Sequence, residues 1–270
     1  MIERNTLWEI NTINNYISSQ MGFSGNITEM WDTPEFSDEK YIIKSPENVF
    51  LANINDQIIF NGLNLDINNW LYQCNTSNII QFDKNTILVR MTKNDDFQTF
   101  QDKPEPRAEL CCPILNIING NTYKISFSTY LNGDFHFEQY DNPVTIFQIH
   151  QELTTGNHSL TIGLDKGSYF TMSNNCETGT DSIYSAFSPI SFDLGHWINW
   201  EITYKPSNTT DGLININKNG QDVFHAENVK TAYNCDNYFK IGVCKLNWLI
   251  NPSSIDEISI FYSNLTVVQL

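Results

Sequence analysis

The sequence is short of positive charge. Fifteen lysine and arginine residues stand against thirty-one aspartate and glutamate residues, which gives a formal net charge of −16 over 270 residues. A field of that sign opposes nucleic acid and anionic membrane surfaces, and no basic cluster interrupts it locally. We therefore expect neither a nucleic-acid partner nor a membrane partner.

Long apolar runs are also missing. No stretch approaches the length of a transmembrane helix, and the first residues lack the basic segment and apolar segment of a signal peptide. A secreted protein whose signal had been removed would have the same sequence, so localisation stays open. The oligomeric state is equally open.

Cysteine is present but scattered. The six cysteines are too far apart for a metal ribbon, so we assign no metal and no cofactor; they are Cys74, Cys111, Cys112, Cys176, Cys235 and Cys244. A Cys176–Cys235 bridge is one option, but six cysteines allow fifteen complete pairings and nothing selects among them. The sequence favours buried free thiols.

Helical periodicity is scarce too, and only residues 11–21 read as a short helix. From Gln57 onward, short β-prone runs alternate with Asn, Gly, Asp and Pro, without βαβ units. This predicts an all-β jelly-roll (concanavalin-like) sandwich of two antiparallel sheets over residues 56–270, with residues 1–55 as an N-terminal extension packed on it. The expected strands are 57–60, 70–73, 78–82, 86–92, 107–112, 122–131, 144–151, 159–164, 169–173, 197–205, 213–217, 222–225, 238–243 and 255–270.

Several of these strands have two unlike faces. In residues 144–151, the two-residue period puts Thr145, Phe147 and Ile149 on one side; it puts Val144, Ile146, Gln148 and His150 on the other. The same alternation gives polar faces with Arg107 and Glu109, with Lys124 and Tyr130, and with Tyr238, Lys240 and Cys244. A concave floor of such residues is typical of a sugar-chain site, whereas a sheet that is merely wet on one side is the alternative.

Three segments, in chain order, resemble motifs of the β-jelly-roll polysaccharide lyases, a group that includes alginate lyases and their glucuronan-lyase and heparin-lyase-like relatives. They are Arg107-Ala-Glu-Leu110, Phe147-Gln-Ile-His150 and Tyr238-Phe-Lys-Ile-Gly-Val-Cys244. The resemblance covers roughly residues 80–270. It implies a lyase that cleaves a uronate-containing polysaccharide by β-elimination.

The resemblance also implies roles for single residues. Arg107 and Gln148 would neutralise the uronate carboxylate, and His150 would act as base or neutraliser. Lys240 would hold the anionic chain. We expect Tyr238 to complete the catalytic set, and the substrate-binding set to be Lys124, Tyr130, Lys240 and Cys244.

One position departs from the family pattern. Where the alginate lyases end the third motif with a proton-shuttling tyrosine, this chain has Cys244. Either Tyr238 or Tyr130 takes over that role, or the protein is an inactive carbohydrate-binding or structural relative. A glycoside hydrolase ranks last because it needs two suitably spaced carboxylates. Glu138 and Asp141 fall instead in a stretch that we expect to be a loop.

Overall fold

The computed structural model describes residues 57–60, 63–66, 71–73, 79–83, 86–97, 99–100, 103–111, 117–151, 158–174, 182–235 and 237–270. All of them belong to one compact unit, Ile42–Leu270. The helix expected at residues 11–21 and the extension expected at 1–55 lie outside the described residues. In the described part of the chain, no helix is long and apolar enough to cross a bilayer.

The larger sheet contains nine of the described strands. Five follow one another as neighbours: β16 (Gln221–Val229), β15 (Gly212–Lys218), β14 (Trp197–Lys205), β9 (Tyr123–Tyr130) and β18 (Glu257–Gln269). Beyond β18 the first half pairs with β5 (Thr86–Thr92), which carries β4 (Ile79–Asp83). The second half pairs in parallel with β1 (Gln57–Phe60), which carries β2 (Leu63–Asp66).

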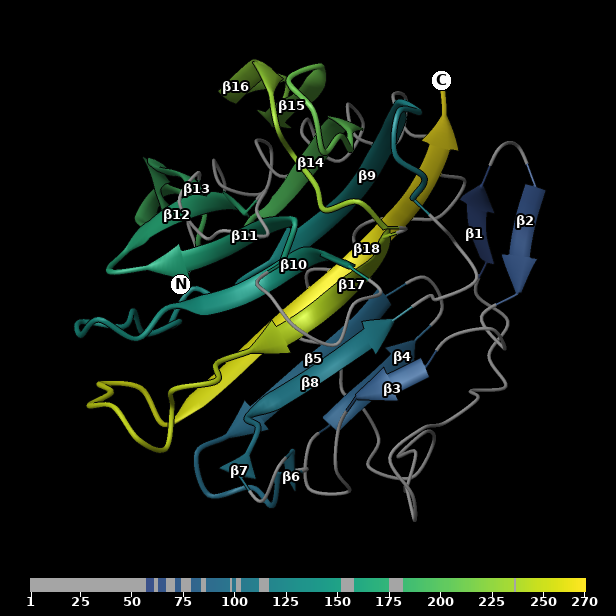
Figure 1. Cartoon of the computed structure of the whole chain (residues 1–270). Helices are drawn as coiled ribbons and strands as arrows, with labels where there is room; N and C mark the ends of the chain where they lie inside the picture. The colour runs from purple at the N-terminus through teal and green to yellow at the C-terminus, as the bar shows by residue number, and fades with distance from the viewer. Residues whose placement is uncertain are drawn as a thin grey trace. The chain divides into compact units, whose positions relative to one another are not determined.

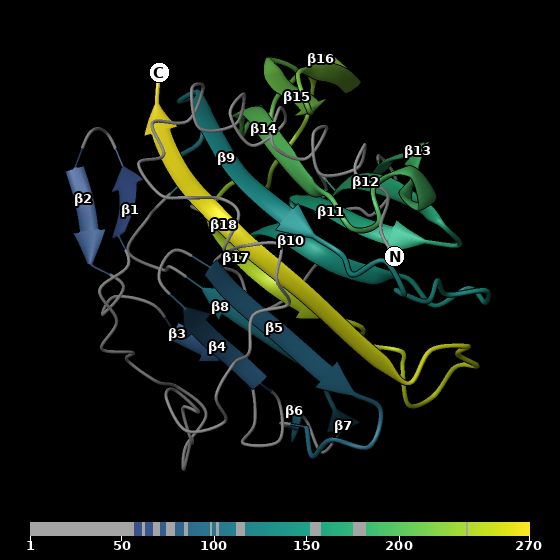
Figure 2. The ribbon, with the colours of Figure 1, turned by 180° about the vertical axis from the view of Figure 1, so that it is seen from behind.

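The smaller sheet contains seven described strands and carries the residues of interest. Their order is β13 (Ser182–Pro189), β12 (Ser168–Asn174), β11 (Leu160–Asp165), β10 (Val144–Gln151), β17 (Asn237–Cys244), β8 (Arg107–Cys111) and β3 (Leu71–Gln73). A short hairpin joins β6 (Thr99–Phe100) to β7 (Lys103–Pro104), and a 3₁₀ turn, η3 (Ile190–Phe192), follows β13. Figures 1 and 2 show β10, β17 and β8 in one layer and β9, β18 and β5 in the other.

The core lies between the two sheets and confirms the expected sandwich. Inward side chains of both sheets interdigitate there: the ring of Phe127 on β9 stacks on that of Phe147 on β10 at a centroid distance of 5.0 Å. Ile149, Phe239 and Ile241 are fully buried in the same core. Because successive strand residues point to opposite faces, Gln148, Tyr238 and Lys240 lie on the outer face of the smaller sheet.

A β-bulge corrects the expected faces at the start of β10. The register with β17 shifts between Thr145 and Phe147, so that the alternation changes phase there. Val144 and Ile146 therefore pack in the core. Thr145, which pairs with Cys244, joins the outer face instead. The sequence placed Gln148 and His150 correctly, because they follow the bulge.

Gly242, on β17 beside this bulge, lets the strand lie close to β8. Its φ of +136° is one that residues with a side chain rarely adopt, and a Cβ there would lie 2.3 Å from the Ala108 carbonyl oxygen. The hydroxyl of Tyr262, reaching across the core from β18, donates to the carbonyl oxygens of Gly242 (2.7 Å) and Ile146 (3.0 Å). This contact ties the bulge in β10 and β17 to the larger sheet.

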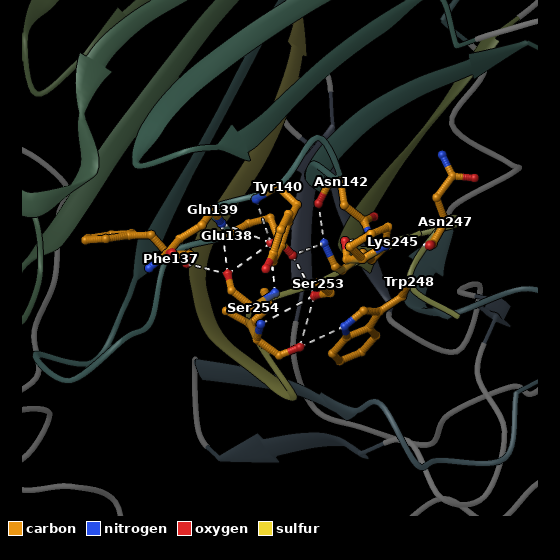
Figure 3. A network of polar contacts seen from close by, with 12 residues as sticks. Phe137, Glu138, Gln139, Tyr140, Asn142, Lys245, Asn247, Trp248, Ser253 and Ser254 are labelled. Atoms are coloured by element: carbon orange, nitrogen blue, oxygen red, sulfur yellow. Dashed lines mark hydrogen bonds and ion pairs between the residues drawn. The ribbon is translucent and has the colours of Figure 1, made fainter. Parts of the chain in front are cut away.

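A buried ion pair fixes the loops next to β10 and β17 (Figure 3). The Lys245 ammonium, directly after β17, lies 2.9 Å from Glu138 Oε2 and also donates to the Asn142 carbonyl just before β10. Ser253 and Ser254 donate further hydrogen bonds to the Glu138 carboxylate. Burial by itself would raise the pKa of Glu138, but the bonds from Ser253, Ser254 and Lys245 outweigh it and hold that pKa at about 2.

The sequence missed several elements. The strands β2, β6, β7 and β13 were not expected, and β16 is longer than the predicted run at 222–225. Among the cysteines in the described part of the chain, Cys111 is buried on β8, and Cys235 and Cys244 are free thiols, so the Cys176–Cys235 bridge is not formed. The remaining cysteines, Cys74, Cys112 and Cys176, lie outside the described residues.

Candidate active site

Three adjacent strands bring the predicted motifs together on the outer face of the smaller sheet. In the register, Gln148 of β10 pairs with Lys240 of β17, and His150 pairs with Tyr238. On the other side of β17, Cys244 pairs with Arg107 of β8. Segments more than a hundred residues apart in sequence thus meet within three strand widths. We call Arg107, Glu109, Gln148, Lys240, His150, His158 and Tyr238 the polar cluster.

Glu109 organises the carboxylate-binding end of the polar cluster. Its side chain accepts a hydrogen bond from Gln148 Nε2 and lies 3.8 Å from Arg107 Nη1. Glu109 is 1% exposed and Gln148 is fully buried, so the amide is held in one orientation. Arg107 also forms an ion pair with Glu105 at 2.8 Å. Gln148 was expected on an open face; instead it is buried there, packed against Glu109.

The tautomer of His150 follows from its contacts. Its Nδ1 lies 2.7 Å from the carbonyl oxygen of Gln151, which can only accept, so Nδ1 carries the proton and Nε2 the lone pair. The ring stacks on Tyr238 at 5.4 Å and lies 5.0 Å from the ring of His158. Burial, and then the charge of Lys240, lowers the pKa of His150 to about 4. The imidazole is therefore neutral at neutral pH.

The start of β17 is anchored by a second buried network. Asn237, immediately before Tyr238, accepts a hydrogen bond from Ser159 Oγ at 2.8 Å, and its backbone exchanges hydrogen bonds with Ile117. Ser159 in turn follows His158. With Asn237 at one end of β17 and Lys245 just beyond the other, the backbone that presents Tyr238 and Lys240 is fixed at both ends. The Lys240 ammonium lies 5.7 Å from the centre of the Tyr238 ring.

The Cys244 thiol is unsuited to proton transfer. It is 4% exposed, and burial followed by the charge of Glu109 raises its pKa to about 12. At neutral pH it remains a protonated thiol beside Arg107. Tyr238, one of the two tyrosines that could supply a phenol in place of the one replaced by Cys244, lies in the polar cluster.

Two of the predicted substrate-binding residues lie elsewhere. Lys124 and Tyr130 are on β9, in the larger sheet, so the structure does not bring them together with Arg107 and Gln148. Lys124 forms an ion pair with Glu201 at 2.6 Å, and Tyr130 packs between Trp197 and Phe261. The expectation that Tyr130 shares a face with Tyr238 is wrong, because strand alternation gives the face of a residue but not its sheet.

Sequence reasoning missed two members of the polar cluster. Glu109 was assigned to the polar face but given no role, and only the tertiary contact with Gln148 reveals one. His158 follows residues 152–157, outside the strand predicted at 159–164, and no motif marked it. Burial, and then the neighbouring His150, lowers its pKa to about 3.

Comparisons with known proteins identify the family. A family model described as polysaccharide lyase matches residues 62–266. The chain belongs to the polysaccharide lyase family. No curated protein matches the sequence.

Solved polysaccharide lyases share the fold. An endo-β-1,4-glucuronan lyase from the fungus Trichoderma reesei superposes with a TM-score of 0.59 at 14% identity, over 73% of this chain and 89% of the other. An alginate lyase from Pseudomonas aeruginosa gives 0.50 at 15% identity, over 71% and 86%. A family 7 alginate lyase crystallised with its product gives 0.50 at 17% identity, over 68% and 80%. At these identities the likeness establishes the jelly-roll sandwich.

The polar cluster combines two cations with carboxylates and an amide. The described residues contain no group of three or more His, Cys, Asp or Glu side chains placed to hold a metal. Around Gln148, the cations Arg107 and Lys240 lie among two carboxylates, Glu105 and Glu109. Such an arrangement can bind a carboxylate through a guanidinium and an amide, with a neutral imidazole and a phenol alongside.

Proposed function

We propose that this member of the polysaccharide lyase family cleaves a uronate-containing polysaccharide by β-elimination at the polar cluster. The observation that carries the proposal is that two functional pairs of side chains lie on adjacent strands. Arg107 and Gln148 can bind a carboxylate. His150 and Tyr238, whose rings stack, can transfer protons. Elimination needs both at one sugar unit.

The first requirement is to neutralise the carboxylate next to C5. The C5 proton is acidic enough to be removed only when the developing enolate-like charge is stabilised by donors. The Arg107 guanidinium would bind the carboxylate, and the second N–H of Gln148 would donate to it while Glu109 holds the first. Glu109 is thus a positioning residue in the proposal.

The second requirement is proton transfer. The lone pair on His150 Nε2 would accept the C5 proton, and the electron pair of the broken C–H bond would form the C4–C5 double bond as the C4–O bond breaks. The Tyr238 hydroxyl would protonate the departing sugar oxygen. A pKa of about 4 makes free His150 a weak base, but an anionic uronate beside it would raise that pKa.

Local charge sets the strength of binding. Lys124 lies on the other sheet and Lys245 is held by Glu138, so Arg107 and Lys240 are the cations that remain at the polar cluster, opposed by Glu105 and Glu109. Because the net charge is −16, a polyanion should bind weakly, and its affinity should change with ionic strength. This salt dependence is part of the proposal.

A panel of uronate polymers, including alginate and glucuronan, tests the proposal through the ultraviolet absorbance of the unsaturated uronate end. We expect one polymer to respond and Arg107→Ala to abolish the response. Arg90→Ala is the matched control, because Arg90 makes an exposed ion pair with Glu257 on the larger sheet. A full panel without any absorbance change would reject the lyase activity.

The second candidate is a protein that binds such a polymer without cutting it. The observation in its favour is Cys244, a buried thiol at the position where the resembling lyases have a tyrosine. In that case Arg107→Ala would still weaken polymer binding, while no polymer would yield unsaturated ends.

A further inference from the structure

A row of side chains continues the polar cluster across the outer face of the smaller sheet. Gln148 pairs with Thr161 of β11, Thr161 with Met172 of β12, and Met172 with Tyr184 of β13. Directly paired residues share a face, so Tyr184 lies on the same face as Gln148, three strands away. At about 4.8 Å between strands, that separation is about 14 Å.

The far end of this row is built as an aromatic shelf, which we define as Phe170 and Tyr184. Gly163 has no side chain, and a Cβ there would lie 2.4 Å from the Phe170 ring, so Phe170 lies directly on the sheet. Tyr184 stacks on Phe170 at 5.6 Å with an interplanar angle of 23°. Phe170 is 4% exposed, whereas Tyr184 is 56% exposed. The fold does not need this stack, because the core lies on the opposite face.

Charged and polar groups border the shelf. The Tyr184 hydroxyl lies 3.3 Å from Asp165 Oδ2. Lys166 follows Asp165 directly, in the turn between β11 and β12, so it adjoins the carboxylate that the Tyr184 hydroxyl contacts. Among the described residues, Lys166 pairs with Asp141 at 3.3 Å, and an exposed ion pair of this kind is readily exchanged for another carboxylate.

Two buried polar atoms, one in the polar cluster and one next to it on the side of the shelf, point to a ligand. Gln148 Oε1 and Thr161 Oγ1, on paired residues, have no hydrogen-bond partner in the described part of the chain. Buried polar atoms are rarely left without a partner, and a site for a hydroxylated ligand is one physical reason for such a pair. Within the described residues, the row therefore has two polar atoms without partners near the polar cluster and the exposed ring of Tyr184 at its far end. The Lys166 ammonium belongs to the turn that adjoins the shelf.

We propose that the aromatic shelf is a second sugar-binding subsite, in which the Tyr184 ring stacks on a uronate unit of the polymer and Lys166 pairs with its carboxylate. The subsite rests on the proposed function and extends it: the substrate is a polymer long enough to cover both the polar cluster and the shelf. The C–H bonds on one face of a sugar ring suit the negative face of a phenol, and the carboxylate of a uronate suits the ammonium. Binding energy gained at this remote unit would favour long chains over short ones.

The test compares Tyr184→Ala with wild type on a responsive polymer and on a short oligosaccharide of the same uronate. Loss of one stacking contact should raise KM for the polymer about tenfold and leave the value for the short substrate unchanged. Tyr184→Phe keeps the ring and should behave as wild type. Phe192→Ala is the matched control, because Phe192 is a 79% exposed aromatic on η3, outside the row.

The outcomes separate the two proposals. If wild type cleaves the polymer and Tyr184→Ala equals Phe192→Ala, the subsite is rejected and the lyase activity stands. If no polymer is cleaved, binding of the same polymers is measured by gel retardation. Weaker retardation of Tyr184→Ala alone would then keep the subsite and reject the lyase activity. Wild type that neither cleaves nor binds any uronate polymer rejects both.

Discussion

Replacing Glu138 by glutamine should destabilise the fold strongly although Glu138 takes no part in the proposed chemistry. The carboxylate lies in the network of Figure 3, 4% exposed and 2.9 Å from the Lys245 ammonium. A pKa that falls from 4.5 in the unfolded chain to about 2 in the folded one stabilises the protein at neutral pH by roughly 3 kcal/mol. Burial lowers the pKa of Lys245 and offsets part of this.

Removing one partner of a buried pair leaves the other charge unpaired, which typically costs about 3–5 kcal/mol. We therefore expect Glu138→Gln to lower the free energy of unfolding by about 3 kcal/mol, measured by urea denaturation at pH 7. Because the pKa of Glu138 is depressed, its contribution is complete above pH 4.5 and is lost as the pH falls towards 2. The difference between wild type and variant should shrink over that window.

Two controls sharpen the test. Glu257→Gln removes an exposed partner of Arg90 and should cost less than about 1 kcal/mol. Adding Lys245→Met to Glu138→Gln removes the unpaired charge, so the double variant should be more stable than Glu138→Gln alone. A loss below about 1 kcal/mol for Glu138→Gln, equal to that of Glu257→Gln, would refute the reasoning.

Three further predictions concern the polar cluster and its backbone. Cys244→Ser should change kcat less than about threefold in the uronate absorbance assay, because a thiol with a pKa of about 12 transfers no proton; a hundredfold loss would contradict this. The acidic limb of kcat/KM against pH should fall near pH 4 rather than near 6.5, because His150 acts in its neutral form and its pKa is lowered; a limb at 6.5 would remove His150 from the mechanism. Gly242→Ala should destabilise the protein by about 1–3 kcal/mol in the same denaturation assay, because of the φ of +136° and the contact with the Ala108 carbonyl; an unchanged midpoint would show that β17 and β8 separate without cost.

The strand period predicted which face each motif residue occupies. It placed Phe147 and Ile149 inward and Gln148 and His150 outward, and it separated Tyr238 and Lys240 from Phe239 and Ile241. It failed at Val144, Thr145 and Ile146 because a bulge changes the phase of the alternation. A bulge depends on the register between strands, which one strand's own sequence does not contain.

What the sequence could not give was the partner of each strand. Lys124 and Tyr130 have the same alternation as the polar-cluster residues but belong to the other sheet. The sequence pattern also does not show what the charged residues Glu109 and Lys245 contact. In the structure, Glu109 orients Gln148, whereas Lys245 is buried against Glu138. The strand β13 was missed because Ser182–Pro189 has apolar residues on both faces, and its outward aromatic, Tyr184, lies in the row described above.

The central claim is that proton transfer at the polar cluster depends on the tyrosine beside His150. The direct measurement is the rate of unsaturated uronate formation by wild type, Tyr238→Phe and Tyr130→Phe on one responsive polymer. We predict that Tyr238→Phe lowers kcat by a factor of about 10²–10⁴, while Tyr130→Phe, on the other sheet, retains the wild-type rate. A Tyr238→Phe variant as active as wild type would contradict the account.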